Sequence, residues 1–129
     1  MTIFEPLLKL PGAMAAFEFR GSGELLDYQI VDPDGPLDKS VLDLLAHMCA
    51  ANLSIATMQA RGWETITEMK GYYPIKQFTL VGFDWSVVVS GLRREAEKTA
   101  GAAALSPFLG VVMANESADY EAAFKLLEA

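Results

Sequence analysis

The residues of this chain most capable of chemistry are its single histidine, His47, and its single cysteine, Cys49. A thiol beside an imidazole can act as a nucleophilic pair, and both groups bind soft metal ions. The two residues are two positions apart in a segment with the pattern of a long helix, where each residue turns by about 100°. Their side chains therefore point in nearly opposite directions, and the sequence predicts no local Cys–His pair.

Both residues have structural explanations. The helical neighbours on the side of Cys49 are apolar, namely Leu42, Ala46 and Leu53, so we expect a small buried thiol. His47 lies one turn after Asp43 on the polar side, where a solvated or weakly paired imidazole is expected. A zinc site needs about four ligands, and beyond these two residues the chain offers only carboxylates. We therefore predict no metal, no cofactor and no enzyme activity.

Three other polar motifs have explanations that need no ligand, and only the third keeps a functional alternative. Gly21-Ser22-Gly23 lacks the Lys-Ser/Thr ending and the following helix of a phosphate-binding loop, so a hairpin turn explains it better. Asp32-Pro33-Asp34 fits a turn, and the further ligands of a calcium loop are missing. Arg93, Arg94 and Lys98 form the one basic cluster, which is either a solvated helix face or an electrostatic contact for an acidic partner.

Composition and charge exclude several classes of partner. The 129 residues have the size of one domain spanning 1–129, and a hydrophobic fraction of 52% is ordinary for a globular protein. A net charge of -7 opposes binding to nucleic acid or to an anionic membrane. We expect no signal peptide, and no apolar run that reaches the roughly 18 residues of a membrane span. A single cysteine fits a reducing compartment, so the expected location is cytoplasmic.

The N-terminal third predicts a short helix followed by a hairpin. Thr2 and Glu5 have the spacing of a capping box for a helix that Pro11 and Gly12 end. Alternation then predicts a half-buried strand over residues 13–20, followed by a return strand over residues 24–30. The residues expected on one face of the first strand are Ala13, Ala15, Phe17 and Phe19.

The longest predicted element is a helix over residues 37–61. Arg61 lies in its last turn, and Gly62 is expected to end it. Residues 63–74 have no sustained period and predict a connection, which can include a short strand over residues 66–69.

The C-terminal half predicts three strands and a closing helix. The strands are expected over residues 77–83, 85–90 and 108–114, with an inserted helical loop over 92–107 between the last two. Ser117 is the expected N-cap of an amphipathic helix. The apolar face of that helix comprises Tyr120, Ala123, Phe124 and Leu127. The order α-β-β-α-β-β-β-α predicts an α+β fold with a five-stranded antiparallel sheet.

Two parallel seams run along the predicted long helix. The first, expected to face the sheet, comprises Leu42, Ala46, Cys49, Leu53, Ala56 and Ala60. The second comprises Val41, Leu45, Met48, Asn52, Ile55 and Gln59. A single sheet cannot cover both seams, since together they exceed the stripe of about 100° that a surface helix buries. We expect the second seam to form a symmetric homodimer, in which the two amides pair with their own copies.

Four segments carry a family resemblance: LxKLPGAMAAFEF (residues 7–19), RGSGELL (20–26), GFDWSVVVSG (82–91) and FLGVVMANESADYEAAFKLL (108–127). They resemble the roadblock, or dynein light chain, superfamily of profilin-like domains, and more narrowly a bacterial branch associated with sulfur-oxidising organisms. The chain departs from that branch at residues 63–74 and 92–107. The resemblance implies a homodimer that binds or regulates a small GTPase, or that scaffolds a larger complex, without catalytic residues.

The functional hypothesis is therefore a non-catalytic dimeric interaction module, acting on a small GTPase or in a metabolic complex such as one of sulfur oxidation. Trp63, Tyr72 and Tyr73 are either a cover over the core or an anchor for a partner, which Arg93 and Arg94 would also contact. The alternative is a small-ligand sensor. Its pocket would be lined by Phe17, Tyr28, Trp85 and Phe124.

We predict that Cys49 is structural, because it lies on the apolar side of the long helix. Cys49→Ala should therefore preserve the binding of any partner, measured with the purified variant. A variant that remains folded but no longer binds would contradict this expectation.

We also predict that residues 92–105 are dispensable for folding, because an exposed insertion adds little loop-closure entropy. A chain in which a short Gly/Ser turn replaces them should stay soluble and unfold cooperatively in urea. Insoluble product, or loss of the cooperative transition, would show that this segment belongs to the core.

Overall fold

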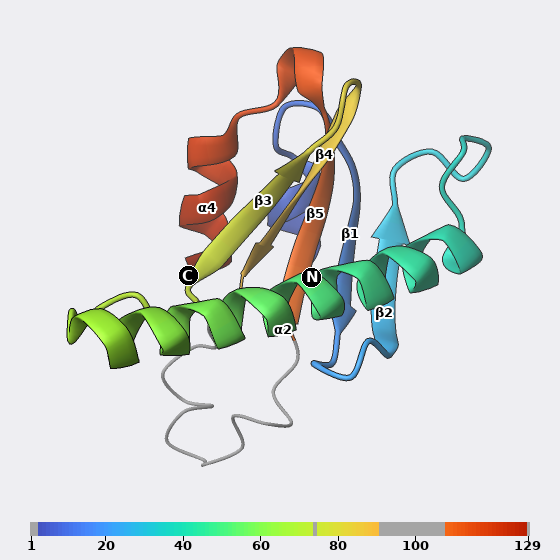
Figure 1. The fold of residues 1–129 in the computed structure, drawn as a ribbon. Helices are drawn as coiled ribbons and strands as arrows, with labels where there is room; N and C mark the ends of the chain where they lie inside the picture. Colours follow the sequence, from blue (N-terminus) through green and yellow to red (C-terminus); the bar gives the residue numbers. More distant parts are fainter. Residues whose placement is uncertain (1–2, 74, 91–107, 129) are drawn as a thin grey trace.

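The computed structural model describes residues 3–73, 75–90 and 108–128. The elements follow the predicted order (Figure 1): α1 Glu5–Leu8, β1 Ala13–Phe19, β2 Leu25–Ile30, α2 Lys39–Thr67, β3 Gln77–Val81, β4 Trp85–Ser90, β5 Phe108–Ala114, the 3-10 helix η1 Asn115–Ser117 and α4 Tyr120–Glu128. The strands form one five-stranded sheet in the order β2-β1-β5-β4-β3, and every neighbouring pair is antiparallel. The predicted fold class is confirmed, while the expected insertion over 92–107 lies outside the described residues.

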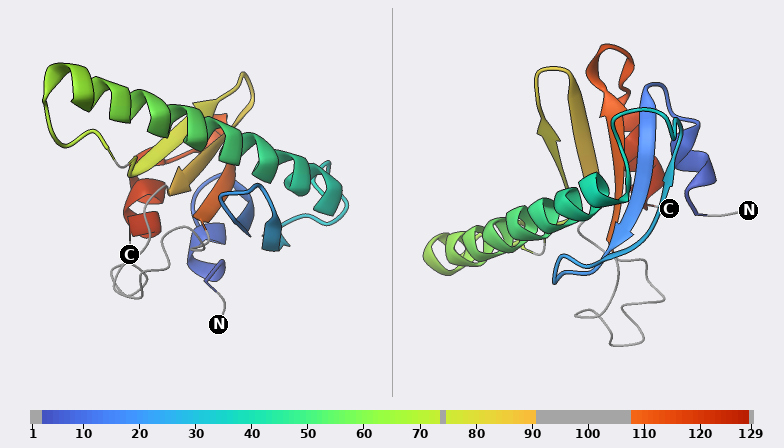
Figure 2. Two further views of the ribbon diagram at one scale, coloured as in Figure 1. Left: turned by 60° about the horizontal axis from the view of Figure 1, so that its bottom comes forward. Right: turned by 90° about the vertical axis from the view of Figure 1, so that its right-hand side faces the viewer.

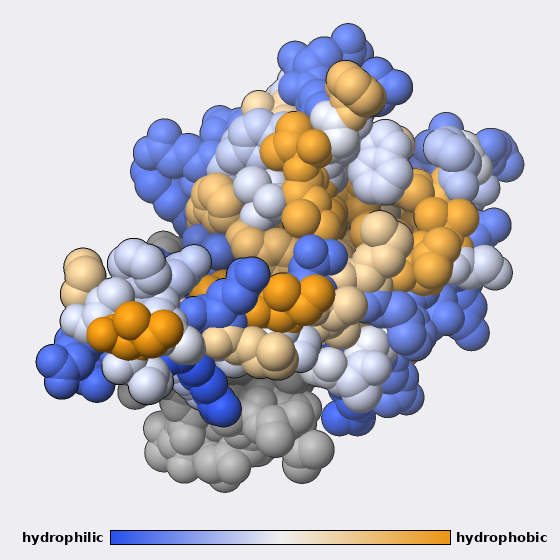
Figure 3. Space-filling view, viewed as in Figure 1, coloured by the Kyte–Doolittle hydropathy of each residue, from blue (hydrophilic) through white to orange (hydrophobic). Residues whose placement is uncertain are grey.

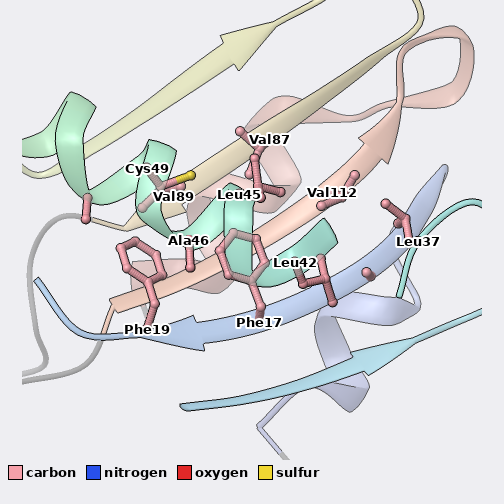
Figure 4. Close-up of a cluster of buried hydrophobic side chains, with 12 residues drawn as sticks. Phe17, Phe19, Leu37, Leu42, Leu45, Ala46, Cys49, Val87, Val89 and Val112 are labelled. Carbon is pink, nitrogen blue, oxygen red and sulfur yellow. The ribbon is translucent and has the colours of Figure 1, made fainter. Parts of the chain in front are cut away.

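The helices cover both faces of the sheet (Figure 2). On one face, α2 packs its Leu42, Ala46 and Cys49 against strand residues that include Phe17 and Val112, as Figure 4 shows. On the other face, α1 and α4 cover a second apolar cluster. Its buried members include Phe4, Leu7, Ala16, Val88, Val111, Met113, Ala123 and Leu127. The central strands are therefore apolar on both sides, as expected for a layer between helices.

Strand β1 differs from its predicted pattern in two ways. It was expected to be half-buried, but it lies inside the sheet and contributes Phe17 to one core and Ala16 to the other. The pairing with β5 also shifts register between Ala13 and Ala15. Such a bulge adds one residue and breaks the alternation. Met14 consequently packs on the α2 side and Ala13 on the α4 side, opposite to the prediction for Ala13.

Helix α2 begins and ends later than predicted. Asp38 is its N-cap, and the Asp38 carboxylate accepts a hydrogen bond from the backbone N–H of Val41 at 2.9 Å. The helix continues through Gly62 to Thr67 and ends at Glu68, which has a left-handed φ of 60°. The predicted end at Arg61 and the short strand over 66–69 are therefore wrong. A glycine inside a helix lowers helix stability by only about 1 kcal/mol relative to alanine, and the favourable helix propensity of the residues on both sides offsets this loss.

The two short helices begin differently from the prediction. At the C-terminal end, Ser117 belongs to η1, and the carboxylate of Asp119 accepts from Ala122 N–H at 3.0 Å, so Asp119 caps α4 instead of the predicted Ser117. The predicted apolar face of α4 is confirmed, since all four of its residues pack in the second cluster. At the N-terminal end, α1 starts after Phe4 without a side-chain cap, and Thr2 lies outside the described residues.

Helix α2 is the one described helix long and apolar enough, by length and composition, to cross a membrane. This differs from the expectation that no segment reaches that length. A core helix passes the same test, and α2 lays Leu42, Ala46 and Cys49 on the sheet. The packing therefore accounts for the apolar residues on the sheet-facing side of α2, although only 33% of its most apolar stretch is buried.

A close contact in the sheet predicts the effect of one substitution. Gly110 pairs with Phe17 across the β1–β5 ladder, and a Cβ on Gly110 would lie 2.5 Å from Cζ of the fully buried Phe17 ring. Gly110→Ala should therefore lower the free energy of unfolding by about 1–3 kcal/mol, measured by urea denaturation.

Gly62 provides the matched control. A Cβ on Gly62 meets nothing within 4 Å, and the residue lies inside α2. Gly62→Ala should raise the free energy of unfolding by about 0.5–1 kcal/mol through helix propensity. Equal effects of the two substitutions would contradict the packing of Gly110 against Phe17.

Candidate interaction surface

His47 and Cys49 do not form a site. Cys49 is fully buried between α2 and the sheet, and burial raises the pKa of its thiol to about 12, so the thiol stays protonated at neutral pH. His47 lies on the exposed side, where its Nδ1 is 2.8 Å from the carbonyl oxygen of Asp43. Its ring packs beside Gly23. Gly23 lies in the turn between β1 and β2, so Gly21-Ser22-Gly23 forms the predicted hairpin turn. Within the described ranges, no group of three His, Cys, Asp or Glu side chains could hold a metal ion.

The two seams of α2 lie where their patterns placed them, with one exception. Five residues of the sheet-facing seam are buried, and Ala56 is partly buried. In the second seam, Met48 and Ile55 are 47% and 55% exposed, and Val41, Asn52 and Gln59 are also exposed. Leu45 is the exception, because it is buried in the core beneath α2.

The exposed apolar surface of α2 is wider than the predicted seam. Leu44 and Met58 are also exposed, and they follow the spacing Leu44, Met48, Ala51, Ile55, Met58. This alternation of four and three residues is a third seam that could have been found in the sequence. We call the outer face of α2 the surface formed by Val41, Leu44, Met48, Ala51, Asn52, Ile55, Met58 and Gln59. Figure 3, which views α2 from its solvent side, shows hydrophobic residues along it.

Polar groups on the outer face are partly satisfied within the helix. The side-chain N–H of Asn52 donates to the carbonyl oxygen of Met48 at 2.8 Å. An amide group has a second N–H and a carbonyl oxygen, which remain chemically suited to bond a partner. The outer face therefore combines apolar side chains with an amide at its centre.

The predicted aromatic residues at the end of α2 divide into two groups. Trp63 and Tyr72 are about half exposed and form an edge-to-face pair with ring centroids 6.5 Å apart. Tyr73 turns inward against a small core cluster, and its hydroxyl accepts from the Arg61 guanidinium at 2.8 Å. Among the described residues, Trp63 and Tyr72 are therefore exposed, while Tyr73 packs over the small core cluster.

The connection after α2 is held against the helix by Glu64. Its carboxylate accepts the backbone N–H groups of Tyr73 at 3.0 Å and Gly71 at 3.2 Å. These bonds favour the ionised form and, led by that from Tyr73, lower the pKa of the Glu64 carboxyl. Because Gly71 and Tyr73 flank Tyr72, these bonds hold the backbone of Tyr72 close to Trp63 of α2.

The four residues expected to line a ligand pocket do not come together as a set, although Phe17 and Tyr28 are paired across the β1–β2 ladder. Phe17 is fully buried on the α2 side of the sheet, while Phe124 packs on the opposite side with α4. Trp85 is 43% exposed at the start of β4, and Tyr28 lies on the edge strand β2. The predicted pocket is therefore not formed by these residues. Arg93 and Arg94 lie outside the described residues.

Solved structures share this fold. The chain is similar to a structure described as "MglB with tetrameric arrangement", with a TM-score of 0.66, 17% identity, and coverage of 96% of this chain and 76% of that one. A Roadblock/LC7 domain from Streptomyces avermitilis gives a TM-score of 0.63 at 17% identity, over 92% of this chain and 79% of that one. The gliding protein MglB of Thermus thermophilus gives 0.64 at 17% identity, over 97% and 85%. These similarities confirm the roadblock-like fold.

At the level of sequence, no functionally curated protein matches the chain. One family model does match, over residues 4–94, which is more than half of the chain. Since the match includes α1, α2 and the first four strands, the protein belongs to the family described as "Uncharacterized conserved protein (DUF2173)", with a roadblock-like fold.

Proposed function

We propose that this protein is a non-catalytic homodimeric interaction module or scaffold. Two copies associate through the outer face of α2, and the joined surface binds another protein, either a small GTPase or a subunit of a metabolic complex such as one of sulfur oxidation. The observation that carries the proposal is the row of exposed apolar side chains on α2. These side chains are Val41, Leu44, Met48, Ile55 and Met58.

A contiguous apolar row on one helix face is a feature of protein–protein contacts rather than of solvated surface. The spacing of the row also suits a two-fold contact between antiparallel copies of α2. With the axis near Asn52, Met48 of one copy lies beside Ile55 of the other. The small side chain of Ala51 next to the axis allows the two helices to approach closely.

The edge of the sheet supports a second copy as the occupant. Strand β3 is an edge strand, and α2 extends past it, as Figures 1 and 2 show. Ile66, in this last part of α2, is 84% exposed. Within the described ranges, the outer edge of β3 pairs with no strand and lies beside exposed apolar side chains; such an edge favours association, and a second copy would cover both features.

A partner protein would contact what the dimer leaves free. The Trp63–Tyr72 pair is held in place by Glu64 and is of the residue types enriched in binding hot spots. The assignment of this partner to a GTPase or to a metabolic complex rests on the sequence resemblance to roadblock domains. The genes adjacent to the one that encodes this chain would separate the two classes.

The dimer is tested by charging the outer face of α2. Met48→Glu combined with Ile55→Glu should give a folded monomer, because the interface would bury like charges against apolar side chains. Light scattering measures the mass, and circular dichroism checks the fold. Ser54→Glu combined with Thr65→Glu, which adds the same charge at exposed positions on the polar side of α2, should leave a dimer.

Two results would overturn the proposal. One is a wild-type protein that is already monomeric at micromolar concentration. The other is a Met48→Glu, Ile55→Glu variant that keeps the dimer mass.

A further inference from the structure

The turn between β3 and β4 carries a phenylalanine with no cover from the described residues. Phe83 is fully exposed between Gly82 and Asp84, and the flanking Val81 and Trp85 are 60% and 43% exposed. Tight turns are dominated by Gly, Pro, Asn, Asp and Ser, so the geometry of this turn does not call for an aromatic side chain. Phe83 therefore has no evident part in the stability of the domain.

The backbone that presents Phe83 is held by Asn115. The backbone N–H of Asn115 donates to the Asp84 carbonyl at 2.9 Å, and its side-chain N–H donates to the Gly82 carbonyl at 2.7 Å. Across the turn, Gly82 N–H donates to the Trp85 carbonyl at 3.0 Å. The peptide group before Phe83 and the one after Asp84 are thus held by hydrogen bonds, and a pre-organised backbone loses less conformational freedom on binding.

Asn115 is in turn oriented by the core. The hydroxyl of the buried Ser86 donates to Asn115 Oδ1, and the Tyr120 hydroxyl lies 2.7 Å from Ser86 Oγ. This network runs from α4 through β4 to the turn. Phe83 is therefore presented by a braced turn and not by a free loop.

The surroundings of Phe83 are acidic. It borders a hollow that is also lined by Asp84, Ala114, Asn115 and Glu116. Two of these lining residues are carboxylates and none is basic. In a chain of net charge -7, such a hollow attracts a lysine or arginine and disfavours an anionic membrane.

We propose that the β3–β4 turn is a docking point for a partner protein that presents an apolar pocket beside a lysine or arginine. The Phe83 ring enters the pocket, and the basic side chain enters the hollow between Asp84 and Glu116. The turn lies at the end of β3 and β4 away from α2 (Figure 1), so it stays accessible when the outer face of α2 is covered. The inference does not depend on the dimer, although a dimer would present two such turns.

The first experiment places a photo-crosslinking benzoylphenylalanine at position 83 of the full chain in its native host. The cross-linked partner and its contact peptide are identified by mass spectrometry, and the partner is then purified. Phe83→Ser should weaken its binding by about tenfold or more, as truncation of a central aromatic anchor does. Val31→Ser, which removes another exposed apolar side chain outside this turn, should change the Kd by less than about twofold.

The second experiment tests the charges. Asp84→Asn combined with Glu116→Gln should weaken binding by several-fold and flatten its dependence on NaCl concentration, because the basic contact is lost. The melting temperature of each variant checks the fold, and Phe83→Ser should leave it unchanged.

Several outcomes would overturn the proposal. In the first, the Phe83→Ser variant binds the purified partner with an unchanged Kd. In the second, the photo-crosslinker at position 83 reacts only with a second copy of this chain. In the third, it gives no specific cross-link. The wild-type protein could also sediment with phosphatidylserine vesicles while Phe83→Ser does not. That result would show that the turn binds a membrane and not a protein partner.

Discussion

The structure depends on the packing of one long helix across one face of a sheet whose other face is already covered. Helix α2 inserts Leu42, Ala46 and Cys49 over Phe17 and Val112, and this contact closes the larger of the two main cores. A straight helix can lay only one side on a sheet. Since α2 is apolar over more of its circumference than that side, the same packing that stabilises the domain leaves an apolar surface outside it.

The other layers follow from this arrangement. The central strands are buried on both faces, so β4 and β5 carry nearly continuous apolar sequences. Gly110 has no side chain because the Phe17 ring occupies that space. Reactive groups are separated by the same layers, which bury Cys49 and leave His47 on the outside. Among the described residues, the features on which the proposals rest are surfaces: the outer face of α2, the Trp63–Tyr72 pair and the turn at Phe83.

These surfaces differ in how the domain supports them. The outer face of α2 is a regular helix, and its shape follows from backbone hydrogen bonds alone. The Trp63–Tyr72 pair depends on Glu64, whose ionised carboxylate accepts backbone N–H groups of the connection. The turn at Phe83 depends on Asn115, which joins it to Ser86 and Tyr120. Three separate surfaces on a small domain are consistent with a module that contacts more than one protein chain.

The sequence by itself determined the order of the elements, because strand alternation, turn glycines and helix periodicity are local properties of neighbouring residues. It also separated the buried seam of α2 from the second one. Only the tertiary structure decided that Leu45 is buried while Leu44 is exposed. It also decided that the bulge near Ala13 turns this residue to the α4 side of the sheet, and that Asn115 braces the turn at Phe83. Each of these depends on contacts between residues far apart in the chain, whose energies outweigh the weak local preferences that a pattern expresses.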